Sequence, residues 1–186
     1  MGADLDARFK ELLTRVRGEL KPLGWRKEGQ NFRLFLPDGL CRIISFQRNQ
    51  YNTAENLEFI INLGAYFERG ETVSNRRFKE YECPLRRRIS RNPPGPERWW
   101  DIRADTDMDA LSDEMREALE RAQAWFRQWA PSKEAAVEAA LNGQVPMVPY
   151  KTLRALVDMG YGDRIYEHIK DIQVPIYRAL AEEIKG

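Results

Sequence analysis

The stretch LEFIINLGAYF, residues 57–67, decides the predicted fold. Apolar side chains recur at every second position from Leu57 to Phe67, and the positions between them include Glu58, Asn62 and Tyr66. Because successive side chains of a β-strand point to opposite faces, this alternation predicts a strand with one apolar face toward a core. A sheet with one buried and one polar face is typically antiparallel.

Neighbouring segments extend this strand into a sheet. Alternating residues over 31–36 and 42–48, separated by the turn signal Pro37-Asp38-Gly39, predict two further strands. Residues 84–90 and 98–103 have the pattern of a fourth and a fifth strand. We therefore expect about five strands, mostly antiparallel.

Helical periodicity flanks the predicted sheet. Apolar spacing predicts helices over 4–21 and 107–129, with Thr106 as N-cap of the second, which is long enough to cover the apolar sheet face. The predicted class is α+β: an N-terminal helix, the sheet, a long covering helix and a helical C-terminal extension. We expect an α+β domain over 1–130 and, over 131–186, an extension with helices at 134–142, 150–159, 163–172 and 174–184.

The composition excludes several classes of protein. The chain has 186 residues, 42% of them hydrophobic, and a net charge of +1, which is unlike a disordered chain. One histidine and two cysteines are too few for a multi-ligand zinc site, so we expect no metal and no cofactor. No signal peptide or membrane span is evident, and Cys41 and Cys83 are interpreted as reduced thiols of a cytoplasmic protein with no membrane contact.

The near-neutral total conceals an uneven distribution of charge. Residues 1–104 carry a net charge of +6 and residues 105–186 a net charge of −5, and 22 of the 30 basic residues are arginine. The planar guanidinium suits carboxylates and phosphates, so this enrichment is consistent with recognition of anions. Solvated surface faces are the alternative explanation.

The polar face of the predicted sheet is the candidate site. Strand alternation places side chains of three strands on this face, and arginines of 84–90 can join them. The candidate ligand-binding residues are Arg33, Gln47, Asn62, Tyr66, Arg86 and Arg88. Guanidinium groups beside amides and a phenol suit a carboxylate, a phosphate or an acidic protein surface. An ordinary solvated sheet face remains the alternative.

The segment 76–103 raises a second possibility. It holds nine basic and four acidic residues, interleaved with Phe78, Tyr81, Trp99 and Trp100. Basic and aromatic side chains together bind single-stranded nucleic acid by charge and stacking. The overall pI of 7.7 is low for such a domain, so nucleic acid is not the expected partner. We expect the two tryptophans to pack on opposite sides of a strand.

No catalytic residue is assigned. The sequence contains no Gly-rich phosphate loop, no nucleophile elbow and no zinc-binding helix motif, and His168 lies alone on a predicted helix. The alternative of an enzyme would use Arg33 and Arg88 to bind a small anionic substrate. In that case Tyr66 or Glu58 would transfer the proton.

Four motifs occur in an order that resembles a known family. They are LKPLGWRKEGQNFRL at 20–34, DGLCRIISFQRN at 38–49, FIINLGAYF at 59–67 and CPLRRRI at 83–89. They resemble the domain of unknown function 4304 family, found mainly in bacteria, although Trp25 stands where that family usually has Phe. The matching positions are Gly24, Gly29, Phe32, Phe46, Gln47, Asn62, Gly64, Cys83 and Arg88. The resemblance covers residues 5–130 and implies an α+β domain with an antiparallel sheet, but no activity.

The leading hypothesis is therefore a non-enzymatic binding module. Its Arg-bearing sheet face would recognise an anionic partner, either a protein surface or a small anionic ligand, and an immunity-like role fits a small bacterial protein. The oligomeric state is left open.

Overall fold

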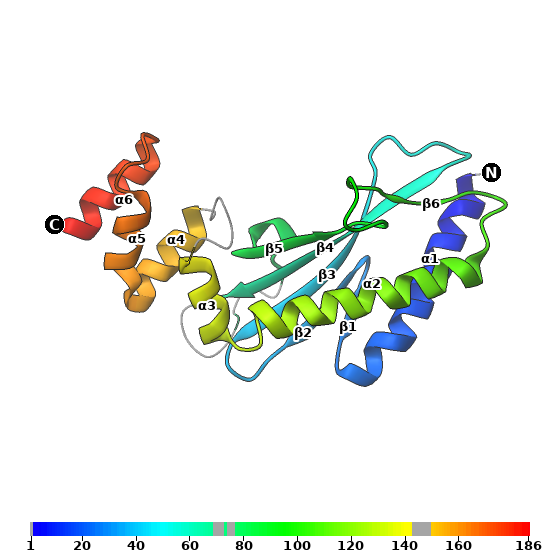
Figure 1. Cartoon of the computed structure of the whole chain (residues 1–186), viewed down its shortest axis with the longest axis horizontal. Helices are drawn as coiled ribbons and strands as arrows, with labels where there is room; N and C mark the ends of the chain where they lie inside the picture. The colour runs from blue at the N-terminus through cyan, green and yellow to red at the C-terminus, as the bar shows by residue number, and fades with distance from the viewer. Residues whose placement is uncertain (1, 69–72, 74–76, 143–149) are drawn as a thin grey trace. The chain divides into compact units, whose positions relative to one another are not determined.

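The computed structural model describes residues 2–68, 73, 77–142 and 150–186 (Figure 1). These residues form two compact units. The first consists of the described residues within 1–34, 42–63 and 87–127, and the second of those within 35–41, 64–86 and 128–186. Each unit combines segments that are distant in sequence, and the boundary expected at residue 130 stays a prediction.

The sheet has six strands. They are β1 (Arg26–Glu28), β2 (Asn31–Phe35), β3 (Leu40–Arg48), β4 (Leu57–Phe67), β5 (Leu85–Ile89) and β6 (Trp100–Ile102). The order is β1-β2-β3-β4-β5, β6 also pairs with β4, and the sheet is antiparallel as predicted. The additional strand is β1, whose three side chains are all exposed, so it has no apolar alternation to reveal it. The α+β class is confirmed.

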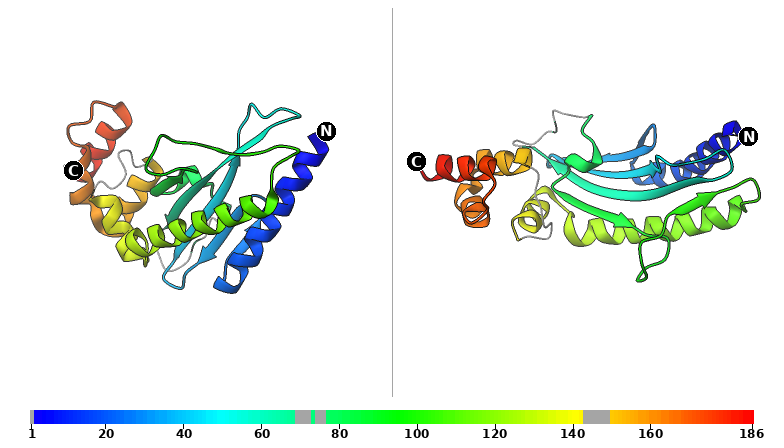
Figure 2. Two further views of the ribbon diagram at one scale, coloured as in Figure 1. Left: turned by 45° about the vertical axis from the view of Figure 1, so that its right-hand side comes forward. Right: turned by 90° about the horizontal axis from the view of Figure 1, so that it is seen from above.

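Two helices cover the apolar face of the sheet in the first unit. In α1 (Gly2–Leu20), the Phe9 ring lies 5.4 Å from that of Phe59 on β4. In α2 (Met108–Trp129), the Phe126 ring lies 5.6 Å from the guanidinium of Arg42, which shares a face of β3 with Phe46. Figures 1 and 2 show α2 running along the sheet, with its first turn beside α1. The long covering helix is confirmed, and α1 shares its role.

The start of α2 differs from the prediction. Asp107, not Thr106, is the N-cap, because Oδ1 of Asp107 accepts hydrogen bonds from the backbone N–H groups of Asp109 (2.9 Å) and Ala110 (3.1 Å). Thr106 instead accepts from the N–H of Arg103 at 2.8 Å, which closes the preceding turn. The two backbone donors hold the pKa of Asp107 below its ordinary value, since they stabilise the carboxylate.

The predicted helical character of the C-terminal residues is confirmed. The helices are α3 (Lys133–Leu141), α4 (Tyr150–Leu156), a π-helical turn (Val157–Tyr161), α5 (Gly162–Ile169) and α6 (Pro175–Lys185). Gly160 has a φ of 92°, a left-handed conformation that glycine adopts without steric cost, and it kinks the chain between α4 and α5. Across the described residues, no helix combines the length and apolar character needed to span a membrane.

The second face of the sheet is less exposed than predicted. Ile43 and Ile60, which alternation places there, are fully buried. Arg33 and Asn62 on the same face are only 4% exposed. Both sides of the central strands are therefore largely shielded from water, because the polar positions of these strands are interrupted by isoleucines that bury well. The polar face predicted as the candidate site is therefore buried at Arg33 and Asn62, and the exposed candidate residues on it lie away from its centre.

Candidate functional site

Three of the predicted residues form one hydrogen-bonded row across adjacent strands. Gln47 lies on β3, Asn62 on β4 and Arg88 on β5. The amide Nδ2 of Asn62 donates to Oε1 of Gln47 at 2.7 Å, and Nε of Arg88 donates to Oδ1 of Asn62 at 3.0 Å. The row thus follows from strand alternation together with strand order.

Exposure increases along this row from its centre to Arg88. Asn62 is buried, and both atoms of its amide are used, which removes the cost of burying a polar group. The side chain of Arg88 is 42% exposed, and its Nη1 lies 3.0 and 3.2 Å from the two carboxylate oxygens of Glu97. The buried amide therefore fixes a guanidinium that faces solvent and already holds a carboxylate.

Arg33 is buried rather than exposed. Its side chain is only 5% exposed, and its Nε donates to Oε2 of Glu28 at 2.8 Å. The reason is β1, which pairs with β2 so that Glu28 lies opposite Asn31 and Arg26 opposite Arg33. This hairpin gives Arg33 a carboxylate of its own, which makes it a structural residue of the sheet margin.

Tyr66 and Arg86 belong to the second unit and have partners there. The Tyr66 ring stacks on Phe78, with centroids 4.0 Å apart and an interplanar angle of 5°, and its hydroxyl donates to Glu68 at 2.8 Å. Nε of Arg86 donates at 2.7 Å to Glu80, whose side chain is 10% exposed. All three predicted arginines are thus paired with carboxylates in the structure.

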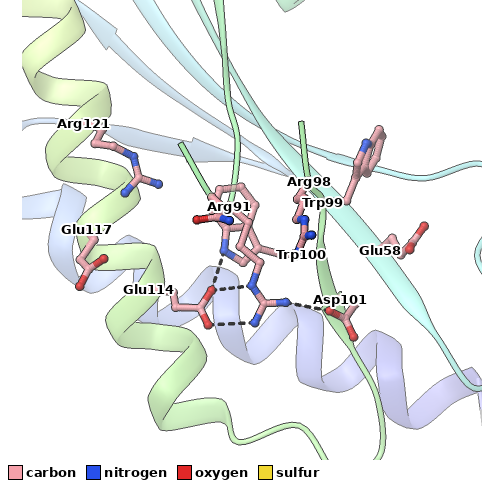
Figure 3. A pocket seen from close by; sticks show the side chains of 10 residues that line it. Glu58, Arg91, Arg98, Trp99, Trp100, Asp101, Glu114, Glu117 and Arg121 are labelled. Carbon is pink, nitrogen blue, oxygen red and sulfur yellow. Dashed lines mark hydrogen bonds and ion pairs between the residues drawn. The ribbon is translucent and has the colours of Figure 1, made fainter. Parts of the chain in front are cut away.

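A polar pocket in the first unit was not predicted. It has a volume of about 610 Å³ and is open to solvent beside α2 (Figure 3). At its centre, Arg91 makes two 2.9 Å hydrogen bonds to Glu114 of α2 and one to Asp101 of β6. The indole N–H of Trp100 also donates to Glu114, at 3.0 Å. The hydrogen bonds to Glu114 are the main reason that the pKa of Arg91 is raised.

No motif or spacing in the sequence predicts this pocket. Arg91 and Glu114 are 23 residues apart, and they meet only because α2 packs beside the edge strand β6. The weak available signal was the pair Trp99-Trp100, for which we expected packing on opposite sides of a strand. Trp100 is indeed fully buried, with its ring stacked 5.8 Å from Phe59, whereas Trp99 is half-buried and lines the pocket.

The comparison with known proteins gives one match. The family model described as a domain of unknown function, DUF4304, matches residues 16–128, which is more than half of the chain. The chain belongs to this family. The matched region contains all six predicted site residues and the whole Arg91 pocket. No curated protein and no solved structure matches the chain.

The two side chains considered for proton transfer, Glu58 and Tyr66, have different hydrogen-bond partners. Within the DUF4304 region, Glu58 accepts a 2.7 Å hydrogen bond from Asn49, and Tyr66 is bonded to Glu68. His168 is exposed on α5, outside that region. Among the residues that the structure describes, no group of three or more His, Cys, Asp or Glu side chains has the arrangement of a metal site.

Proposed function

We propose that this DUF4304 protein is a non-enzymatic binding module that recognises an acidic surface of a protein partner through Arg88. The observation that carries the proposal is the pair formed by Asn62 and Arg88. A buried amide holds Nε of the guanidinium at 3.0 Å, so the side chain is oriented before any partner arrives. Orienting the donor in advance reduces the entropy lost on binding.

Glu97 indicates where a partner carboxylate would bind. It meets Nη1 of Arg88 with both oxygens, and its side chain is 46% exposed. An exposed ion pair contributes only about 0–1 kcal/mol, because both charges are well solvated when apart. A carboxylate on a partner surface can therefore replace Glu97 at little cost.

We also propose that the protein works in the cytoplasm. Cys41 and Cys83 are both buried, and neither forms a disulfide with a described residue, which fits a reducing compartment. An immunity-like role, in which a small bacterial protein binds one acidic partner, fits the same features.

The test is the affinity for a short poly-glutamate peptide, measured by fluorescence anisotropy at low ionic strength. Arg88→Ala is expected to weaken binding by up to about fivefold, since the ion pair that it removes is exposed and contributes about 0–1 kcal/mol, where 1.4 kcal/mol would be a factor of ten. Arg87→Ala is the matched control, because Arg87 is exposed and points to the other face of β5. Equal weakening by both variants would mean that only net charge matters and would contradict the proposal.

A further inference from the structure

We propose that the Arg91 pocket is a second binding site, which takes the phosphate or carboxylate group of a small ligand between Arg98 and Arg121. This goes beyond the proposed role of Arg88, which lies outside the residues that line the pocket. Arg98 comes from the loop before β6, and Arg121 from α2. Figure 3 shows them on either side of Arg91.

The centre of the pocket is electrostatically complete without a ligand. Arg91 is bonded to Glu114 and Asp101, and Asp101 also lies 3.2 Å from Arg103. The two carboxylates and the two guanidinium groups neutralise one another's charge. Glu114 also accepts a hydrogen bond from Trp100. They therefore form a fixed floor, and a ligand must be bound by the remaining groups.

Arg98 and Arg121 are the two arginines lining the pocket that form no ion pair with a described carboxylate. The guanidinium of Arg98 makes no hydrogen bond or ion pair with any described residue, and that of Arg121 donates only to the carbonyl of Ser90, at 3.3 Å. By contrast, Arg33, Arg86 and Arg88 each hold a carboxylate. A guanidinium carries five donors that match the geometry of an oxyanion, so each of these two arginines is suited to bind such a group in the pocket.

Arg121 shows a further sign of an incomplete site. Its Nε is inaccessible to solvent and has no hydrogen-bond partner among the described residues. Buried donors are nearly always satisfied, so this orphaned donor adds to the cost of shielding the Arg121 guanidinium from water. An oxyanion that binds the outer nitrogens of Arg121 offsets part of the cost of shielding this guanidinium from water.

The remaining acids of the pocket restrict the class of ligand. Glu58 and Glu117 also line it, and Glu117 forms no ion pair with a described residue. These carboxylates repel an extended polyanion, since like charges at close range raise its binding free energy. The pocket therefore favours a compact ligand with one oxyanion group over a nucleic-acid strand.

The experiment is a titration of the full chain followed through the arginine Nε–Hε resonances by NMR. Inorganic phosphate is the probe in one arm and acetate in the other, both at constant ionic strength, which distinguishes a phosphate from a carboxylate ligand. We expect saturable shifts of Arg98 and Arg121 in at least one arm. The apparent affinity should fall about tenfold in Arg98→Ala and remain unchanged in Arg87→Ala.

Two outcomes overturn the proposal. One is the absence of a saturable shift in both arms. The other is an affinity that Arg98→Ala and Arg87→Ala reduce equally, because the anion would then respond only to net charge. Since the Arg98 side chain is exposed and its guanidinium has no hydrogen bond or ion pair with a described residue, its removal leaves the test valid even if Arg121→Ala proves unstable. Arg121→Lys, which keeps the charge but loses the planar donors, should weaken binding less than Arg121→Ala.

Discussion

Nε of Arg88 donates a 3.0 Å hydrogen bond to Oδ1 of Asn62, so a guanidinium whose side chain is 42% exposed is fixed by a residue that is 4% exposed. The two residues are 26 positions apart in sequence and meet because β4 and β5 are neighbours in the sheet. The buried partner cannot move to follow Arg88. The direction of the guanidinium is therefore set by the fold, and this relationship underlies the proposed function.

Asn62→Ala is expected to destabilise the protein by about 1–3 kcal/mol, because it removes an acceptor from Arg88 and a donor from Gln47 while leaving buried space. The measurement is urea-induced unfolding followed by circular dichroism. Asn92→Ala is the control, since Asn92 is exposed, and its stability should stay within about 0.5 kcal/mol of the wild type. Equal stabilities of the two variants would show that the row contributes nothing.

Glu97→Gln is expected to strengthen the binding of poly-glutamate by up to about fivefold. The substitution removes the carboxylate that occupies Arg88, and the lost exposed ion pair contributes about 0–1 kcal/mol. Glu55→Gln is the matched control, because Glu55 is exposed and has no side-chain ion pair with a described residue. If Glu55→Gln raised the affinity as much as Glu97→Gln, the gain would come from net charge alone.

Arg91→Ala is expected to lower the free energy of unfolding by about 1 kcal/mol. Its hydrogen bonds to Glu114 and Asp101 join charged groups, but the side chain is 36% exposed, so solvent screening reduces their contribution to the free energy of unfolding. Arg91→Lys should recover only part of the loss, because an ammonium cannot bind Glu114 through two parallel bonds. Full recovery by lysine would mean that charge, and not the paired geometry, matters at this position.

The N-cap of α2 should make the stability of the protein decrease at acidic pH. The pKa of Asp107 is lowered in the folded protein, chiefly by the backbone N–H of Ala110. A lowered carboxyl pKa adds stability above the unfolded value of about 3.9, and this is lost as the pH falls through the folded pKa. Asp107→Asn keeps an acceptor for the cap but does not titrate.

The measurement for Asp107 is the midpoint of thermal unfolding between neutral and acidic pH. The wild type should be more stable than Asp107→Asn at pH 7, and the difference should shrink below about pH 4. A difference that stayed constant with pH would show that the charge of Asp107 contributes nothing.

Regular patterns made the sheet and the row predictable. The alternation over 57–67 has the bounds of β4, and the same period placed Gln47, Asn62 and Arg88 on one face. Period-2 spacing determines faces directly, since it follows from backbone geometry. The family match over 16–128 agrees with the motifs that the sequence analysis identified.

Other features depend on contacts that no local pattern contains. The strand β1 has three exposed residues, so only its pairing with β2 defines it, and that pairing is what gives Arg33 a partner in Glu28. The pocket joins Arg91 to Glu114 and Arg121 to Ser90, which are 23 and 31 residues apart. Such pairs arise from the packing of α2 and cannot be obtained from spacing.

The most direct test of the central claim is to map the bound poly-glutamate by NMR on the uniformly ¹⁵N-labelled protein. The account predicts that the largest shifts occur at the Nε–Hε of Arg88 and at the side-chain amide of Asn62, and that Arg88→Ala abolishes the shift at Asn62. Shifts that spread evenly over exposed arginines such as Arg87, with Asn62 unaffected, would contradict it.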